Sequence, residues 1–579
     1  MMSRYFRAAD LSLIKLRPFS ALRDVLHEGY SLTQLRTDLL AGIVVALVAV
    51  PLGMALGIAS GVAPQNGLYT VIFAGFTVAL LGGSRCQVTG PTAAFVVILL
   101  PIVSKFGLGG LLTAGLLSGI ILVVMGAARM GQLIRFIPFP VTTGFTSGIA
   151  VVIATLQFKD FFGLKPEHLP ESYLGRVSAL FHARGTAEPI EFAVGICTLA
   201  ILILWPRINK KIPAPLVALS TAALGVYALR ASIPELEIAT IQSRFNGIPA
   251  GFPDFQMPWN FSGAEGRPLV FNLELIRDLM PSAFAIAMLG AIESLLSAVV
   301  ADGMARTRHD PDAELVALGT GNLICPFFGG IPATGAIART ATNVRYGGRT
   351  PIASMVHALF TLLILLILAP LVSKLPMASL AALLILVAYN MSEVRHFFHI
   401  LKAAPKSDVI VLLTCFFLTV IFDMVVGVTV GIVLAALLFM RRMAELTSTQ
   451  NLTGKDSGKG TEIEVPRGVV LYHIAGPLFF GAAEKAVGTI ATVRGDFKVL
   501  ILLMEDVPTL DITGMVALEG VIQTLIQSKK SVILTGVQSQ PRSLLEKSRL
   551  KENSSKFIIC TEMNEAVEMA KKAMSESTG

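Results

Sequence analysis

The sequence predicts an α-helical polytopic membrane protein with an α/β domain at its C-terminus. The chain has 579 residues, of which 54% are hydrophobic and only 15% charged, whereas soluble domains carry about 25% charged residues. Apolar segments long enough to cross a hydrocarbon layer of about 30 Å as helices recur from residue 39 to residue 440. Beyond residue 461 the pattern changes to alternating strand-like and helical runs.

Fourteen apolar segments can be placed, seven in each half of the chain. The first seven cover about residues 39–56, 67–82, 91–105, 108–128, 139–158, 191–206 and 213–230. The second seven cover about residues 279–301, 314–328, 335–344, 351–373, 376–391, 408–422 and 424–440. An odd number of spans gives the two halves opposite orientations, so we expect a 7+7 inverted repeat within residues 39–443, at about 39–230 and 279–443.

Basic residues place the N-terminus inside the cell. Residues 1–38 then form a cytoplasmic arm, and the inner loops include Arg129, Arg207, Arg306, Arg395 and Arg441. The short outer turns are nearly free of Lys and Arg, as the positive-inside rule requires. This topology accounts for the net charge of +8, so we expect a lipid bilayer around the chain and no nucleic-acid partner.

Two short spans that follow Gly/Pro-rich polar stretches mark a candidate anion site. The third span follows residues 82–91 (GGSRCQVTGP), and the tenth follows residues 329–335 (GGIPATG). Interrupted spans at matching positions of inverted halves are typical of a midplane binding site, although Gly and Pro also kink ordinary packed helices. Free amides at two facing helix N-termini suit an anion. The candidate binding residues are Thr89, Thr92, Ala93, Ala94, Ala336, Ile337, Ala338 and Arg339.

Two charged residues fall inside the apolar spans. Glu293 lies near the middle of the eighth span, and Arg339 lies one turn into the tenth. Ionisable residues at this depth mark functional sites by default. Desolvation favours the protonated form of a carboxyl group, so Glu293 is the candidate proton carrier. The alternative is a structural role, in which Glu293 pairs with Arg339 or with a backbone site. Arg339 either attracts the anion or anchors its helix.

A polar linker at residues 444–461 leads into a soluble α/β domain at residues 462–579. Strand-like runs cover residues 468–474, 499–504, 531–534 and 556–559, and helical runs cover about 482–492, 513–527, 542–550 and 562–574. Asp511 and Thr513 are candidate regulatory residues, because a phosphate on Thr513 would lie at a helix N-terminus. The alternative is an ordinary N-cap.

We expect a protein that is not an enzyme and that needs no cofactor or metal. The five cysteines are scattered without a C-x-x-C pair, and the histidines lack the companions of a metal cluster. The C-terminal domain contains no nucleotide-binding glycine fingerprint.

Several motifs resemble the SulP family of anion transporters. They are residues 38–43 (DLLAGI), 64–69 (PQNGLY), 90–94 (GPTAA) and 332–340 (PATGAIART), and residues 511–514 (DITG) resemble a loop of the STAS domain of this family. The resemblance implies a core and a gate domain, a substrate site between the third and tenth spans, a homodimer, and a STAS domain that can bind a cytosolic protein. It also maps the family's acidic position in the eighth span onto Glu293.

Two further runs, residues 288–296 (MLGAIESLL) and 476–484 (GPLFFGAAE), resemble the bacterial DauA type. This resemblance implies secondary active, proton-coupled uptake of C4-dicarboxylates such as succinate, fumarate and aspartate across the bacterial inner (plasma) membrane, with both termini in the cytoplasm. A sulfate or bicarbonate permease or exchanger of the same family is the alternative, because backbone amides accept all of these anions. Sodium coupling, an anion channel and an anion-sensing signalling protein also remain open.

Overall fold

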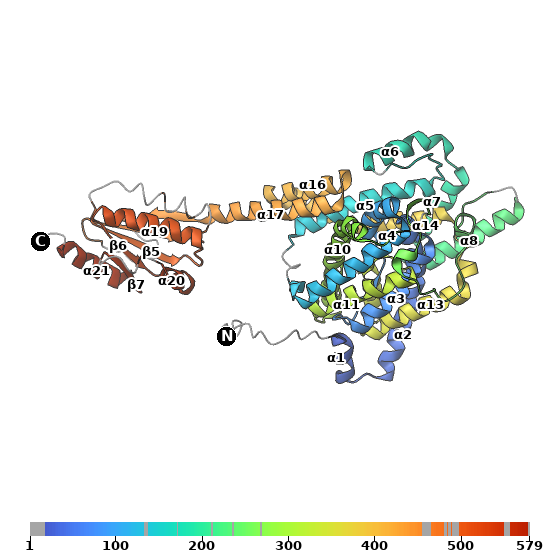
Figure 1. The fold of residues 1–579 in the computed structure, drawn as a ribbon, viewed down its shortest axis with the longest axis horizontal. Helices are drawn as coiled ribbons and strands as arrows, with labels where there is room; N and C mark the ends of the chain where they lie inside the picture. The colour runs from blue at the N-terminus through green and yellow to red at the C-terminus, as the bar shows by residue number, and fades with distance from the viewer. Residues whose placement is uncertain are drawn as a thin grey trace. The chain divides into compact units, whose positions relative to one another are not determined.

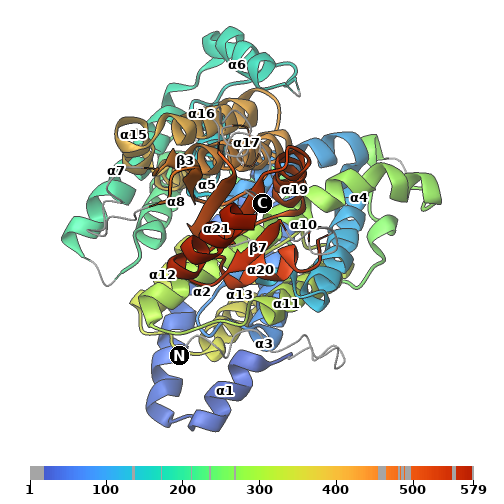
Figure 2. The same cartoon turned by 90° about the vertical axis from the view of Figure 1, so that its left-hand side faces the viewer.

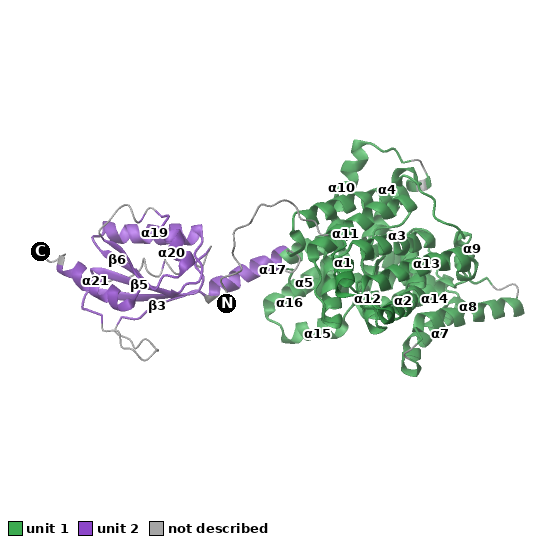
Figure 3. Ribbon diagram, turned by 90° about the horizontal axis from the view of Figure 1, so that it is seen from below, with its two compact units in different colours: residues 1–432 green, residues 433–579 purple. Residues whose placement is uncertain are grey.

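In the computed structural model the chain divides into two units, Met1–Ile432 and Val433–Gly579 (Figure 3). Hydrophobic helices form most of the first unit. The structure describes residues 18–132, 137–170, 172–209, 212–233, 237–266, 269–453, 465–479, 483, 488, 497–548, 550 and 556–576. Within these residues, nine helices are long and apolar enough to cross a membrane. The other predicted spans are α3, α11, α12, α16 and the second arm of α4.

The first predicted repeat contains the elements that run from α2 to α8. A short helix, α1 (Ser20–Glu28), precedes it. The repeat consists of α2 (Leu32–Ala59), α3 (Pro64–Leu81), β1 (Thr89–Gly90), α4 (Ala93–Ala127), α5 (Phe139–Phe161), α6 (Tyr173–His182), α7 (Pro189–Ile208) and α8 (Ala214–Ser232) (Figure 1). The helix α9 (Ile241–Phe245) lies between the two repeats.

The second predicted repeat contains the matching elements. It consists of α10 (Leu273–Ala305), α11 (Pro311–Ile324), β2 (Thr334–Gly335), α12 (Ile337–Arg345), α13 (Pro351–Val372), α14 (Met377–Met391), α15 (Val394–Ala403), α16 (Lys406–Ile421) and α17 (Met424–Leu446). Short 3-10 turns lie at Ala183–Thr186, Pro258–Asn260, Ala264–Gly266 and Cys325–Phe328. Each short strand therefore precedes a helix at the corresponding place of its repeat.

The third and fourth predicted spans are two helices that meet directly at Gly107, and α4 denotes both of them. This residue has φ 71° and ψ −172°, far from helical values. A side chain would be strained at this φ, and its Cβ would meet the backbone of Gly263. Glycine therefore allows the chain to reverse between two spans without a separate loop.

The membrane helices pack as two groups, and each group takes helices from both repeats. In the first group α4 packs on α10 and α11, and α13 packs on α2 and α3. In the second group α5 packs on α14 and α16, and α7 packs on α8 and α14. Figure 2 shows α7, α15 and α16 on the opposite side of this unit from α3, α11 and α13. This exchange of helices between halves is the packing expected of an inverted repeat.

The second unit is a five-stranded sheet with helices on both faces. The strand order is β3 (Ser448–Asn451), β4 (Val469–Ala475), β5 (Val499–Asp506), β6 (Ser531–Thr535) and β7 (Phe557–Cys560), and all pairs except β3–β4 are parallel. One core holds residues of α19 (Ile512–Gln527) and α20 (Ser539–Leu545), and the other holds residues of α21 (Met563–Glu576).

The structure differs from the sequence prediction at the expected linker. Residues Ser448–Asn451 form β3, which pairs with β4 in the register Ser448↔Ala475 to Asn451↔Tyr472. The run reads as a connector because all four residues are polar, but polar side chains also suit an exposed edge strand. The remaining residues from 454 to 461 of the expected linker, and most of the expected helix at 482–492, lie outside the described residues.

Candidate functional site

Two short strands hold the beginnings of α4 and α12 beside each other. Thr89 pairs with Gly335 and Gly90 with Thr334 in antiparallel register, and the Ala336 amide donates to the Val88 carbonyl at 2.8 Å. Because antiparallel strands run in opposite directions, the helices that follow them begin at one strand pair and lead away from it in opposite directions. The predicted meeting of two half-helices is therefore present.

Neither helix is capped by the side chain of its own first residue. The N-cap residues are Thr92 for α4 and Ala336 for α12, and both are in extended backbone conformation without a side-chain cap bond. The first amides of each helix have no intrahelical partner, and together with the helix dipole they form a region that attracts anions. Ala93, Ala94 and Ala336 are buried, whereas Ile337 and Ala338 are exposed. The first turn of α12 is thus the more open of the two.

The structure places the candidate proton carrier at the start of α4. Glu293 lies in α10 and is half-buried, and its Oε2 accepts a hydrogen bond of 2.8 Å from the Thr92 hydroxyl. Among the described residues, no ion pair joins Glu293 to Arg339, so the structural ion pair that the sequence left open does not form in this conformation. The carboxylate instead occupies a donor that belongs to the predicted anion site.

Arg339 contacts the backbone that leads into α4. Its side chain is 1% exposed, and its Nη2 donates to the carbonyl of Pro91, between Gly90 and Thr92. A Cβ on Gly90 would collide with the guanidinium, so only glycine permits this approach. The other guanidinium donors, Nε and Nη1, have no hydrogen-bond partner among the described residues. Arg339 therefore anchors the strand pair and places its charge behind the start of α4.

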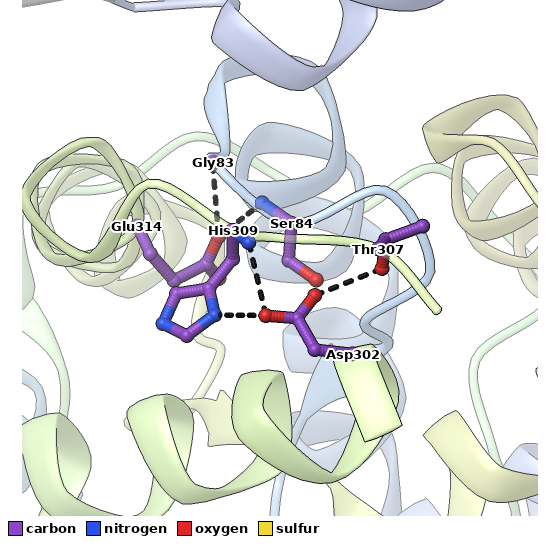
Figure 4. Close-up of polar contacts among 6 residues, drawn as sticks. All are labelled: Gly83, Ser84, Asp302, Thr307, His309 and Glu314. Carbon is purple, nitrogen blue, oxygen red and sulfur yellow. Dashed lines mark hydrogen bonds and ion pairs between the residues drawn. The ribbon is translucent and has the colours of Figure 1, made fainter. Parts of the chain in front are cut away.

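A second membrane carboxylate, Glu314 in α11, holds the segment before β1. It is 1% exposed, and its Oε2 accepts hydrogen bonds from the amides of Gly83 (2.9 Å) and Ser84 (3.0 Å) (Figure 4). Its Oε1 accepts from Gln87 Nε2 at 2.9 Å, and the same Nε2 lies 2.7 Å from Ser294 Oγ, one residue after Glu293. This network fixes β1 relative to α10 and α11.

The turn from α10 to α11 has its own polar cluster. The carboxylate of Asp302 accepts from Thr307 Oγ1 at 2.8 Å, from the His309 amide at 3.0 Å and from His309 Nδ1 at 2.7 Å (Figure 4). A cavity of about 800 Å³ extends from this cluster along α10 to Ile292 and Leu296. Ile292, which lines the cavity, directly precedes Glu293 in the sequence.

No prediction from the sequence concerns the partners of Glu314 or Gln87, and the sequence predicts no functional role for His357. Glu314 is the first residue of the predicted span 314–328, and in the structure it lies in the first turn of a helix that begins at Pro311. His357 in α13 is 1% exposed, and neither ring nitrogen has a hydrogen-bond partner among the described residues. One signal was available for Glu314, because the polar segment 82–91 must find acceptors for its backbone amides inside the membrane.

The remaining predicted residues divide between the site and the second unit. Thr89 is 2% exposed and its hydroxyl has no partner among the described residues, so it is buried beside the strand pair. In the second unit Asp511 is the N-cap of α19, and its Oδ1 accepts from the Gly514 amide at 2.7 Å. Thr513 is exposed. The capping role of Asp511 is present, and a regulatory role of either residue stays a prediction.

Comparison with known proteins identifies the family. Residues 35–415 match the sulfate permease family, and residues 461–566 match the STAS domain. The chain is 40% identical over 526 residues to YvdB of Bacillus subtilis (strain 168), which is named provisionally as a sulfate transporter; the match covers 90% of this chain and 95% of that protein. It is 30% identical over 535 residues to the bicarbonate transporter BicA of Picosynechococcus sp., covering 89% of this chain and 91% of BicA.

Solved structures give the same fold. Murine Slc26a9, described as an anion transporter in the inward-facing state, aligns with a TM-score of 0.82 at 19% identity, over 99% of this chain and 97% of that chain. The transmembrane domain of a cyanobacterial BicA aligns with a TM-score of 0.59 at 27% identity, over 70% of this chain and 98% of that domain.

These matches confirm the predicted fold and family but do not show the DauA-type assignment. The relatives described above are named as sulfate and bicarbonate transporters, not as DauA-type dicarboxylate carriers. The chain therefore belongs to the sulfate permease (SulP) family of secondary anion transporters, as an integral membrane protein with a C-terminal STAS domain.

Proposed function

We propose that the chain is a proton-coupled carrier that takes up a small inorganic oxyanion, with sulfate as the first candidate and bicarbonate as the second. The names of its relatives support this class of anion over the C4-dicarboxylates that two short motifs suggested. The hydrogen bond between Thr92 and Glu293 is the single observation that carries the coupling. A homodimer, a cytosolic partner of the STAS domain and a bacterial inner-membrane location stay predictions.

The anion would bind between the starts of α4 and α12. Each uncapped helix start offers several amide donors and a partial charge of about +0.5. Arg339 adds a full positive charge from behind the backbone at Pro91. Exposed Ile337 and Ala338 leave the first turn of α12 accessible. A tetrahedral or planar oxyanion can accept hydrogen bonds from both helix starts at once.

Glu293 would couple the anion to a proton. An ionised Glu293 accepts a hydrogen bond from the Thr92 hydroxyl, which is the donor that the anion would use. The negative charge of Glu293 also repels the anion. Two unit charges about 4 Å apart interact by about 4 kcal/mol at an effective dielectric constant of about 20. That energy corresponds to about a thousandfold change in affinity. Protonation of Glu293 removes the repulsion, so proton and anion bind best together, and each raises the affinity for the other.

Movement of the first helix group against the second would then carry both ions across the membrane.

The coupling is tested with Glu293→Gln in proteoliposomes, by uptake of labelled sulfate under an imposed pH gradient. We expect the wild-type protein to accumulate sulfate when the outside is acidic. Glu293→Gln should lose this pH dependence but keep sulfate exchange. The exposed Glu188→Gln is the matched control and should behave as wild type. Unchanged proton-driven accumulation in Glu293→Gln would refute the coupling role.

The anion is tested by competition against labelled sulfate at two pH values. Unlabelled sulfate and bicarbonate should compete better than succinate or aspartate. Stronger competition by succinate would indicate that the protein transports C4-dicarboxylates instead. An anion current across the membrane that does not depend on pH would instead indicate an anion channel.

A further inference from the structure

The carboxyl ends of β4 and β5 bring three possible metal ligands together. His473 lies in β4, and Glu505 and Asp506 end β5. One ligand atom from each of the three lies within 4.8 Å of the other two. We propose that these residues form a site for a divalent transition-metal ion in the STAS domain. The site is separate from the anion site and was not expected from the sequence, because its ligands are brought together only by the pairing of the two strands.

An irregularity in the sheet produces this arrangement. His473 pairs with Leu503, but the next partners are Ala475 and Asp506, so β5 contains one extra residue at this point. In a regular strand, neighbouring residues such as Glu505 and Asp506 point to opposite faces of the sheet. A bulge redirects one side chain, and bulges are common beside functional sites. It allows both carboxylates to approach His473.

His473 faces the Asp506 carboxylate without forming a regular hydrogen bond to it. Its Nε2 lies 3.0 Å from Asp506 Oδ2. The atom is nevertheless buried and has no hydrogen bond of acceptable geometry among the described residues. Neighbouring ligand atoms of a tetrahedral zinc ion, each about 2.1 Å from it, lie about 3.4 Å apart. A separation increased by about 0.4 Å would therefore place Nε2 and Oδ2 as neighbouring ligands of one zinc ion. The carboxylates of Glu505 and Asp506 are exposed, and one oxygen of each lies within 4.8 Å of a ring nitrogen of His473.

The ligand types select the class of ion. An imidazole nitrogen favours zinc, copper, iron or nickel over magnesium and calcium, which prefer oxygen ligands. One nitrogen and two carboxylates suit Zn²⁺, with water in the remaining position. The carboxyl ends of parallel strands are also where α/β sheets bind ligands. An ion there would link β4 to β5 and stabilise the folded unit at residues 433–579.

The site is tested on the full-length protein in detergent, purified through a tag without histidine and treated with EDTA. The protein is incubated with Zn²⁺, passed through gel filtration and analysed for zinc by mass spectrometry. We expect one more retained zinc ion per chain than in the triple variant His473→Ala/Glu505→Gln/Asp506→Asn. His473→Ala alone should abolish this excess, and Asp506→Asn, which keeps the side-chain volume, should lower the affinity about tenfold or more. Zinc should also raise the unfolding temperature of the second unit in the wild type but not in His473→Ala or in the triple variant.

The control is a second histidine–carboxylate pair of the same chain. His396 Nδ1 lies 3.3 Å from Glu393 Oε2, and both side chains are exposed. No third ligand for a metal is found beside this pair in the part of the chain that the structure describes. His396→Ala should therefore retain as much zinc as the wild type. The proposal is overturned if the wild type and His473→Ala retain equal zinc, or if a modest excess of Mg²⁺ displaces the zinc.

Discussion

Removal of the Glu314 side chain is expected to destabilise the protein, because three buried donors form hydrogen bonds with its carboxylate. The carboxylate accepts from the amides of Gly83 and Ser84 and from Gln87 Nε2, all between 2.9 and 3.0 Å. In Glu314→Ala the two amides lose their acceptor, and Gln87 keeps only its contact with Ser294. An unpaired buried donor costs about 1–3 kcal/mol. With two amides left unpaired, we therefore expect Glu314→Ala to lower the free energy of unfolding by about 2–6 kcal/mol.

The isosteric variant Glu314→Gln separates hydrogen bonding from charge. Its amide oxygen can accept from Gly83 and Ser84, but its NH₂ group would face the NH₂ group of Gln87. Gln87 Oε1 has no partner among the described residues. A flip of the Gln87 amide would let this oxygen accept from the new NH₂ group and from the Ser294 hydroxyl. The flip would also move the Gln87 NH₂ group to the buried position where Oε1 has no partner. One buried donor group then stays unpaired, so Glu314→Gln should lose about 1–3 kcal/mol.

The assay is equilibrium unfolding in mixed detergent micelles, followed by sulfate uptake by the purified variants. Glu314→Gln should keep uptake, whereas Glu314→Ala should lose it because the segment before β1 is no longer held. Glu188→Ala removes an exposed ion pair with Lys165 (3.2 Å) and should change the stability by less than about 0.5 kcal/mol. The reasoning fails if Glu314→Ala is as stable as the wild type. It also fails if Glu314→Gln is as unstable as Glu314→Ala.

Two further predictions follow from close contacts. Gly335→Ala should abolish most sulfate uptake per correctly folded molecule, because a Cβ would lie 2.9 Å from Ser294 Cα and push β2 away from α10; uptake at the wild-type rate would contradict this packing. Asp511→Ala should lower the free energy of unfolding of the STAS unit by about 1 kcal/mol because it removes the N-cap of α19. Thr513→Ala, at an exposed position, should change it by less than about 0.5 kcal/mol, and equal effects of the two variants in thermal unfolding would contradict the capping role.

The sequence was sufficient to predict the helices but not their ends. A helix lies at each of the fourteen predicted spans, and nine helices of the described residues are long and apolar enough to cross a membrane. Hydropathy predicts them because an apolar segment in a membrane has few alternatives to a helix. It missed that α2 begins at Leu32, where Ser31 and Gln34 form a capping box. The polar composition of residues 448–451 predicts a linker, but these residues form an edge strand. Whether such a polar segment becomes a strand depends on the neighbouring strand with which it pairs rather than on its own composition.

Side-chain partners in the site were less accessible to sequence reasoning. The spans, the half-helices and Glu293 follow from apolar length, Gly/Pro position and the exclusion of charge from the membrane. The hydrogen bond from Thr92 to Glu293 joins residues 201 positions apart, and the one from Gln87 to Glu314 joins residues 227 apart. No local pattern encodes such pairs. The sequence predicts that Arg339 lies inside a membrane span. Only the packing against Gly90 and Pro91 shows that its guanidinium contacts the backbone.

The two helix starts have similar backbones but different charges around them. Both charged residues act on the α4 side, because Glu293 accepts from Thr92 and Arg339 donates to the carbonyl of Pro91. The start of α12 has no side-chain cap and an exposed first turn at Ile337 and Ala338. A change in the protonation of Glu293 therefore alters the α4 half of the site and leaves the α12 half able to attract an anion. This asymmetry is the physical reason to expect that Glu293→Gln keeps anion exchange while it loses coupling to protons.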